Sequence, residues 1–362
     1  MRERRSPLSA TQPHLDSARS RLRRRRSSRQ FPLDRPQCLM KWSLTKKVRF
    51  SVCLLVSSVC LFLAVRGMNA EQALQELLRS SPLPIVGAVL FLFLSIWIRA
   101  WRWGYLLLPI KSISLFPLFR STLIGFMGNN LLPFRAGELL RGVSIGQSQN
   151  ISKGAALGSI ILERAFDGVV LSLIPFLLLA FLDLAPWVVA ASLALFLVYV
   201  TGLFLIMFTS IGEWAGRCWR RATTMMPPAT AEGLGSIAEH FFQGMKGSNQ
   251  FGSLLTVSLL SFLCWLCNGM YFFLLFEALG INLSFLAALI VQVVIALGAM
   301  LPAGPGDVGS FEYLTVLGLA LFGISQEAAF AYALLAHICQ FVPITAAGLF
   351  FGFRAASNQI WN

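Results

Sequence analysis

The sequence predicts an all-α polytopic membrane protein with about six full spans and two re-entrant helical hairpins that form an inverted repeat. The first observation behind this is composition, because 56% of the 362 residues are hydrophobic and only 13% are charged. The mean hydropathy is +0.69. Soluble proteins carry about 25% charged residues, so the composition excludes an ordinary soluble enzyme or nucleic-acid-binding module. The other observations are six long apolar stretches and two shorter ones that end at Leu-Pro.

The net charge of +14 belongs almost entirely to the start of the chain. Residues 1–50 contain 15 Lys/Arg and 3 Asp/Glu, and the rest of the chain is nearly balanced. Because residues 1–40 lack apolar periodicity, we expect a disordered basic tail. A patch for anionic lipid or nucleic acid is the alternative interpretation, but we expect no nucleic-acid partner. We also expect translation to begin at Met40, which would leave the tail out of the protein.

The membrane domain is expected to cover residues 41–355, followed by a short tail over 356–362. A membrane span needs about 20 mostly apolar residues. The six stretches that meet this requirement are 48–65, 84–108, 155–182, 185–209, 251–277 and 328–352.

Two shorter apolar segments, 115–132 and 283–301, end at a proline and are followed by glycine-rich polar sequence. Basic residues between Lys41 and Arg49 place the N-terminus in the cytoplasm by the positive-inside rule. A full crossing at 115–132 would put the basic loop around Arg217 outside, against this rule. A re-entrant hairpin that enters from the cytoplasmic side and returns to it agrees better with the rule. A second hairpin from outside at 283–301 keeps the C-terminus cytoplasmic, although this segment could also span. We expect a multi-pass protein of the plasma (inner) membrane.

Residues 229–247 differ from the spans, because their apolar side chains recur at the i, i+3, i+4, i+7 spacing of one helix face. We expect an amphipathic helix that lies on the inner membrane interface.

The two hairpins share a short pattern in which proline is followed after three residues by glycine and then a carboxylate. The pattern reads Pro133-x-x-x-Gly137-Glu138 in the first unit and Pro302-x-x-x-Gly306-Asp307 in the second. Paired interrupted helices in two halves indicate a transporter's binding site near the bilayer midplane. Broken backbone at that depth is tolerated only where it is buried in protein or lines a wet cavity.

Charged residues gather around the first unit and the span that follows it. Glu163, Arg164 and Asp167 lie within one helical turn of an otherwise apolar span, and each charge at the bilayer centre costs about 2.5–3.5 kcal/mol. A self-neutralising structural cluster, or a helix end in the cytoplasm, is the alternative. Our hypothesis is that Arg135 and Arg141 hold a lipid phosphate. The carboxylates Glu138 and Asp167 are expected to orient Arg135 and Arg141. The predicted head-group site comprises Asn129, Asn130, Pro133, Arg135, Gly137, Glu138, Arg141 and Arg164.

The second unit has glycines that allow close backbone approach but no neighbouring Lys or Arg. It comprises Pro302, Gly304, Pro305, Gly306, Asp307 and Gly309. Glu163, Asp167, Glu312 and His337 are candidates for a charge network or for proton coupling. The sequence shows no metal-ligand spacing and no P-loop, so we expect no metal and no cofactor.

Three motifs in order resemble the lysylphosphatidylglycerol synthase transmembrane-region family of flippase-like membrane proteins. They are Asn130-Leu-Leu-Pro-Phe-Arg-Ala-Gly-Glu-Leu-Leu-Arg141, Glu163-Arg-x-x-Asp167 and Pro302-x-x-Pro-Gly-x-x-Gly-x-x-Glu312. The resemblance implies a protein that binds or moves a phospholipid or a polyprenyl-phosphate-linked lipid. The family's synthases add a soluble transferase domain after the membrane region, and because this sequence ends at Asn362 we expect no enzymatic activity.

The favoured function is therefore a flippase or scramblase-like transporter of an anionic lipid. A non-transporting lipid-binding subunit or scaffold is the main alternative. A polyprenyl-phosphate-dependent glycosyltransferase is a weaker alternative, because the sequence contains no DxD motif. We expect membrane lipids as partners, with a separate lipid-modifying enzyme as a further one.

Overall fold

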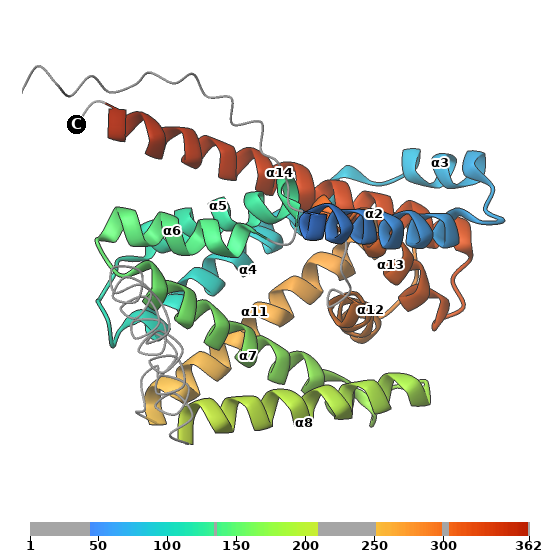
Figure 1. Cartoon of the computed structure of the whole chain (residues 1–362). Helices are drawn as coiled ribbons and strands as arrows, with labels where there is room; N and C mark the ends of the chain where they lie inside the picture. Colours follow the sequence, from blue (N-terminus) through green and yellow to red (C-terminus); the bar gives the residue numbers. More distant parts are fainter. Residues whose placement is uncertain (1–43, 134–135, 209–250, 299–303, 361–362) are drawn as a thin grey trace, which may run out of the picture. The chain divides into compact units, whose positions relative to one another are not determined.

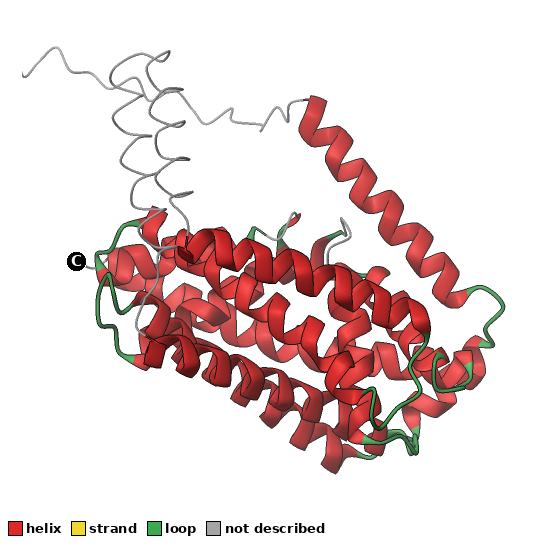
Figure 2. Cartoon of the chain, turned by 90° about the horizontal axis from the view of Figure 1, so that it is seen from below, coloured by secondary structure: helices red, strands yellow, loops and turns green. Residues whose placement is uncertain are grey.

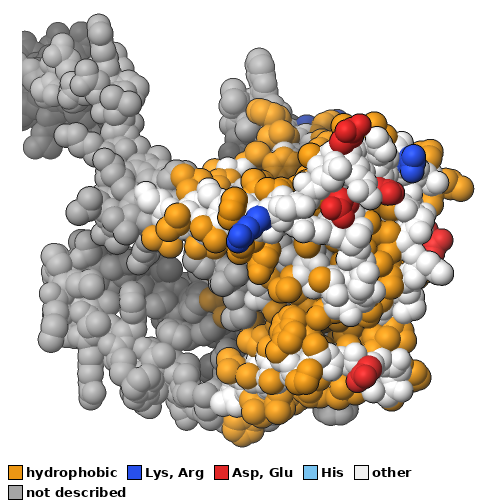
Figure 3. All heavy atoms as spheres, turned by 90° about the vertical axis from the view of Figure 1, so that its right-hand side faces the viewer, with side chains coloured by type: hydrophobic (Ala, Val, Ile, Leu, Met, Phe, Trp, Pro, Cys, Tyr) orange, Lys and Arg blue, Asp and Glu red, His pale blue; other side chains and the backbone are white. Residues whose placement is uncertain are grey.

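The computed structural model describes residues 44–133, 136–208, 251–298 and 304–360. These residues are helical throughout, with short loops and no strand in the described ranges (Figure 2). Among the described residues on the face shown in Figure 3, hydrophobic side chains cover much of the surface and charged side chains are few. Soluble proteins rarely expose an apolar area this large to water. The surface is therefore suited to contact with membrane lipid.

The six long apolar stretches all form helices. They are α2 (Leu44–Val65), α4 (Pro82–Leu107), α7 (Lys153–Leu178), α8 (Pro186–Phe208), α11 (Phe251–Ala278) and α14 (Gln326–Ile360). In Figure 1, α7 and α8 run side by side, and α11 packs along α4. The largest cluster of buried apolar side chains lies between α4, α11, α14 and the helices of the second hairpin.

The count of about six full spans stays a prediction, and length and apolarity together identify the clearest candidates. Within the described residues, α4, α8, α11 and α14 qualify outright. A fifth span is added if the end of α2 and the short helix α3 (Ala70–Leu78), which are bent by 85° relative to each other, count as one. Helix α7 falls outside this set because Glu163, Arg164 and Asp167 interrupt its apolar sequence.

The first predicted hairpin is present as α5 (Leu115–Leu131) and α6 (Gly137–Gln149), which pack against each other. Glycines at the contact allow the two backbones to approach closely. A Cβ on Gly137 would lie 1.9 Å from the Gly125 carbonyl oxygen, and one on Gly128 would lie 2.7 Å from the Gly137 Cα. The chain therefore turns back at the predicted break instead of crossing as one rod.

The second hairpin consists of α12 (Phe285–Gly298), the 3-10 turn η2 (Pro305–Asp307) and α13 (Ser310–Ala320). Gly306 and Gly309 have φ values of +70° and +88°, which favour glycine over any other residue. A Cβ on Gly309 would also lie 2.2 Å from the Ser57 carbonyl oxygen of α2. The close backbone approach expected for these glycines is confirmed.

The breaks of the two hairpins meet on one turn of α14. The Asn130 side-chain amide, at the end of α5, donates to Thr345 Oγ1 at 2.9 Å and to the Phe341 carbonyl at 3.4 Å. Gly306 of η2 lies against the Phe341 ring and the Asn130 carbonyl oxygen. The tips of both units thus share one contact region, as a common site requires.

Several predictions fall outside the described residues. They are the basic tail over 1–40 with Met40, the amphipathic helix over 229–247, the side chains of 356–362, and Arg135 and Pro302. The opposite membrane orientation of the two hairpins stays a prediction.

Candidate functional site

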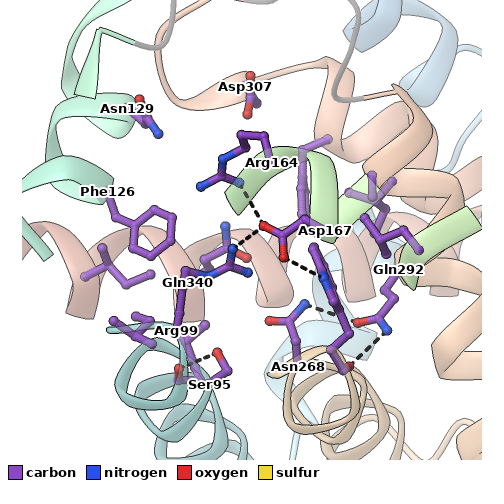
Figure 4. Close-up of a pocket in the computed structure, with 18 of the residues that line it drawn as sticks. Ser95, Arg99, Phe126, Asn129, Arg164, Asp167, Asn268, Gln292, Asp307 and Gln340 are labelled. Carbon is purple, nitrogen blue, oxygen red and sulfur yellow. Dashed lines mark hydrogen bonds and ion pairs between the residues drawn. The ribbon is translucent and has the colours of Figure 1, made fainter. Parts of the chain in front are cut away.

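A cavity of about 330 Å³ lies where the two hairpins, α4, α7 and α11 converge. Figure 4 shows Arg99, Arg164 and Asp167 on its wall, together with the amides Asn268 and Gln292. Aromatic side chains such as Phe126 and Trp265 supply apolar parts of the wall. A cavity of this size, with convergent polar groups on an apolar frame, has the usual form of a small-ligand site.

A network of buried ions forms one side of this cavity. The Asp167 carboxylate on α7 forms ion pairs with Arg99 at 2.7 Å and with Arg102 at 2.5 Å. Both arginines belong to α4. The Trp265 indole N–H donates to the same carboxylate at 3.1 Å. Arg102 also reaches Glu163 at 3.0 Å and donates to the Ser261 hydroxyl at 2.8 Å. These contacts fix the helices α4, α7 and α11 relative to one another.

Arg141 on α6 completes the buried network. Its Nη1 donates to Glu163 Oε1 at 3.0 Å, and its Nη2 lies 2.9 Å from Glu163 Oε2 as an ion pair. The guanidinium carbon lies 3.9 Å from the centre of the Trp103 ring, a cation–π contact. The three buried arginines Arg99, Arg102 and Arg141 face two buried carboxylates, which leaves an excess of one positive charge.

Arg164 and Glu138 lie at the exposed edge of the network. Their side chains are 37% and 36% exposed, and the Arg164 Nε contacts Glu138 Oε1 at 3.1 Å. The terminal nitrogens of Arg164 lie 3.5 Å from Asp167 and 3.7 Å from Glu163. In Figure 4 the Arg164 guanidinium points toward Asp167 from the cavity side. Arg164 is therefore the arginine of this network that is most accessible to a ligand.

Glu312 and His337 form a second polar pair, at the start of α13 and in α14. His337 Nδ1 lies 2.5 Å from Glu312 Oε1, and the other Glu312 oxygen accepts the Gly309 N–H at 2.6 Å. The His337 ring packs between Phe311 and Phe341. This pair connects the second hairpin to α14, and its predicted role in proton coupling stays a prediction.

The structure brings most of the predicted site residues together. Asn129, Asn130, Glu138, Arg164, Asp167 and Asp307 all line the cavity. Pro133 and Gly137 form the turn of the first hairpin, while Gly304, Pro305, Gly306 and Gly309 form that of the second. Arg164 and Asp167, three residues apart on α7, lie 3.5 Å from each other.

The roles expected of Arg141, Glu138 and Asp167 need correction. Arg141 is 3% exposed and already bonded to Glu163, so its guanidinium does not offer a surface for phosphate. Glu138 pairs with Arg164, and Asp167 pairs with Arg99 and Arg102, so neither carboxylate orients Arg141. The physical reason is that burial in an apolar bundle pairs each charge with its nearest opposite charge.

Arg99 and Arg102 are the functional residues that the sequence reasoning missed. Both lie in the apolar stretch 84–108 and are buried in the network. Their spacing of three residues on one face, beside otherwise apolar sequence, is the signal that they face the carboxylates of another span.

Together, the fold and the site define a polytopic helical membrane protein with a charged cavity between two broken helical hairpins. Residues 50–348 match the family described as the lysylphosphatidylglycerol synthase TM region, and the chain belongs to this family. The predicted family is thus confirmed.

Similar proteins occur in archaea. Two UPF0104 membrane proteins of Methanothermobacter thermautotrophicus are 23% and 29% identical to the chain. The matches cover 81% and 70% of this chain, and 91% and 78% of the relatives. A UPF0104 membrane protein of Pyrococcus horikoshii is 23% identical, over 77% of this chain and 89% of its own. These names describe membrane proteins and state no substrate or reaction.

Proposed function

We propose that this protein binds the phosphate of an anionic membrane lipid in its central cavity and moves the lipid between the two leaflets. The lipid is a phospholipid or a polyprenyl-phosphate-linked lipid. The observation that carries the proposal is Arg164, an accessible guanidinium on the wall of a cavity of about 330 Å³ inside a lipid-facing helical protein.

Electrostatics favour an anion in this cavity. The buried network has one more arginine than carboxylates, and the pair formed by Arg164 and Glu138 adds no net charge. A phosphate beside Arg164 would offset the excess positive charge in a region of low dielectric, where such a contact is strong. Arginine also suits phosphate because it binds two oxygens at once and stays charged.

The broken helices favour a protein that transports the lipid over one that only binds it. Both hairpins end at the cavity, with Asn130 and Asp307 on its wall. Non-helical backbone at membrane depth is stable only where protein or a polar cavity satisfies its hydrogen bonds. In transporters such breaks lie at the substrate site and allow one repeat to move against the other.

The setting of the proposed function is a plasma (inner) membrane with both termini on the cytoplasmic side. Since the sequence has no P-loop, the proposed transport runs down a lipid gradient or is coupled to ions. Glu312 and His337 are the candidate groups for such coupling. A separate lipid-modifying enzyme that supplies the substrate is a proposed partner.

The test is leaflet exchange in liposomes that contain the purified protein and fluorescent phosphatidylglycerol. We expect wild-type protein to accelerate exchange and Arg164→Gln to reduce the rate at least about tenfold, the usual effect of losing a charge-assisted hydrogen bond. Arg79→Gln, an exposed arginine at the end of α3, is the matched control and should leave the rate unchanged.

Exchange no faster than in protein-free liposomes, for phosphatidylglycerol and for a polyprenyl phosphate, would contradict transport and favour a lipid-binding scaffold. Equal rates for Arg164→Gln and wild type would contradict the placement of the phosphate.

A further inference from the structure

Neutral amide groups on the cavity wall have hydrogen-bonding capacity that the protein does not use. Gln340 of α14 lines the cavity (Figure 4), and its amide has no hydrogen-bond partner among the described residues. The side-chain oxygen of Asn129 is buried and likewise lacks a partner within the described chain. Asn268 of α11 also lines the cavity, and its amide nitrogen donates to Gln292 at 3.2 Å.

These groups come from three separate helices, α5, α11 and α14, and converge on one space. A buried polar atom without a partner, such as the Asn129 oxygen, costs about 1–3 kcal/mol unless a ligand satisfies it. A carboxamide offers both a donor and an acceptor. The natural complement is a hydroxyl group, which also donates and accepts.

Two carboxylates of the same wall are engaged with arginines. Asp167 contacts Arg99, Arg102 and Trp265, and Glu138 contacts Arg164. Asp307 also has an interaction within the protein. A cationic head group would add to a network that already carries excess positive charge. An unpaired charge in such a place is strongly disfavoured.

We infer that the head group consists of a phosphate joined to an uncharged, hydroxylated group such as glycerol or a sugar, and that the cavity rejects cationic head groups. This inference rests on the proposed function, because Arg164 holds the phosphate in both. In this proposal the neutral amides form hydrogen bonds with the hydroxyl groups of the head group. The lysyl group in the family's name carries positive charge. The proposed selectivity would therefore exclude a lysylated head group.

The experiment measures binding of short-chain lipids to the purified full-length protein in detergent by calorimetric titration. The probes are dihexanoyl phosphatidylglycerol, phosphatidic acid and phosphatidylethanolamine, together with lysylphosphatidylglycerol. We expect phosphatidylglycerol to bind about tenfold more tightly than phosphatidic acid, which corresponds to one or two net hydrogen bonds. The two amine-bearing lipids should bind more weakly than phosphatidylglycerol.

Variants connect this preference to the amides. Gln340→Met and Asn268→Leu keep the side-chain size, and each should weaken phosphatidylglycerol binding about threefold to tenfold while leaving phosphatidic acid binding unchanged. Gln340→Glu adds a free carboxylate and should raise the affinity for lysylphosphatidylglycerol. Gln72→Met, an exposed position on α3, is the matched control.

The outcomes separate this inference from the proposed function. Equal affinity for phosphatidic acid and phosphatidylglycerol would overturn the inference and leave anionic-lipid binding intact. Tightest binding of lysylphosphatidylglycerol to the wild type would overturn it as well. If no anionic lipid binds, both the inference and the proposed function fail.

Discussion

Glu163 is the residue on which the buried network depends most. Its side chain has no solvent exposure, and it contacts Arg102 and Arg141 from two different helices at 3.0 Å or less. Taking ions out of water costs several kcal/mol each, and only close pairing offsets this cost. Glu163 therefore joins α4, α6 and α7 by charge as well as by packing.

Replacing Glu163 by glutamine should lower the free energy of unfolding by about 3–5 kcal/mol, because two buried arginines lose their shared counter-charge. Thermal denaturation of the purified protein in detergent measures the loss. Glu138→Gln is the matched change at the exposed edge, and it should cost about 1 kcal/mol or less. Similar losses for both variants would contradict the assignment of Glu163 as the buried centre.

The i, i+3 spacing of Arg164 and Asp167 predicts that their side chains can meet, and they lie 3.5 Å apart in the structure. The same spacing does not predict their partners. Arg99 and Arg102 lie more than 60 residues away in the sequence, and only the packing of α4 on α7 brings them to Asp167. This is why the sequence pointed to Arg141 as a phosphate ligand, whereas the structure leaves Arg164 as the accessible arginine.

At the level of elements, the first hairpin depends on the contact of glycines in α5 and α6. Gly137 begins α6, and its Cα lies where the α5 backbone carries Gly125 and Gly128. A methyl group at Gly137 would overlap the Gly125 carbonyl oxygen and would meet the Asn129 backbone nitrogen at 2.4 Å. These neighbours are backbone atoms that cannot move without shifting a whole helix.

Gly137→Ala should destabilise the protein by about 1–3 kcal/mol or more, the usual cost of overpacking. Gly202→Ala in α8 is the control, because a Cβ there meets nothing within 4 Å and alanine favours helix. Melting temperatures in detergent compare the two variants. An unchanged melting temperature for Gly137→Ala would show that the two helices do not approach as closely as described.

The positions of both helix breaks follow from the sequence, because proline followed by glycine ends one helix and permits a sharp turn. The meeting of the two breaks on α14 does not follow from it. That meeting depends on Asn130 reaching Thr345 and on Gly306 fitting beside Phe341, contacts between residues far apart in the chain. Local patterns predict where a chain turns, but packing decides what the turn touches.

At the level of the whole molecule, composition predicts an all-helical membrane protein, and the structure and the family confirm it. The count of full spans is less predictable, because α7 combines a spanning length with charges at Glu163, Arg164 and Asp167. A hydropathy pattern treats those charges as an interruption, although in the folded protein Glu163 and Asp167 are buried. The cavity itself is a property of the assembled helices and has no sequence signature.

The central claim is that a lipid phosphate binds inside this cavity at Arg164. Electron cryomicroscopy of the protein in nanodiscs of phosphatidylglycerol tests it most directly. We predict density for a phosphate within hydrogen-bonding distance of the Arg164 guanidinium, with the lipid's hydroxylated group toward Gln340 and Asn268. Lipid density confined to the outer surface, with water alone in the cavity, would contradict the claim.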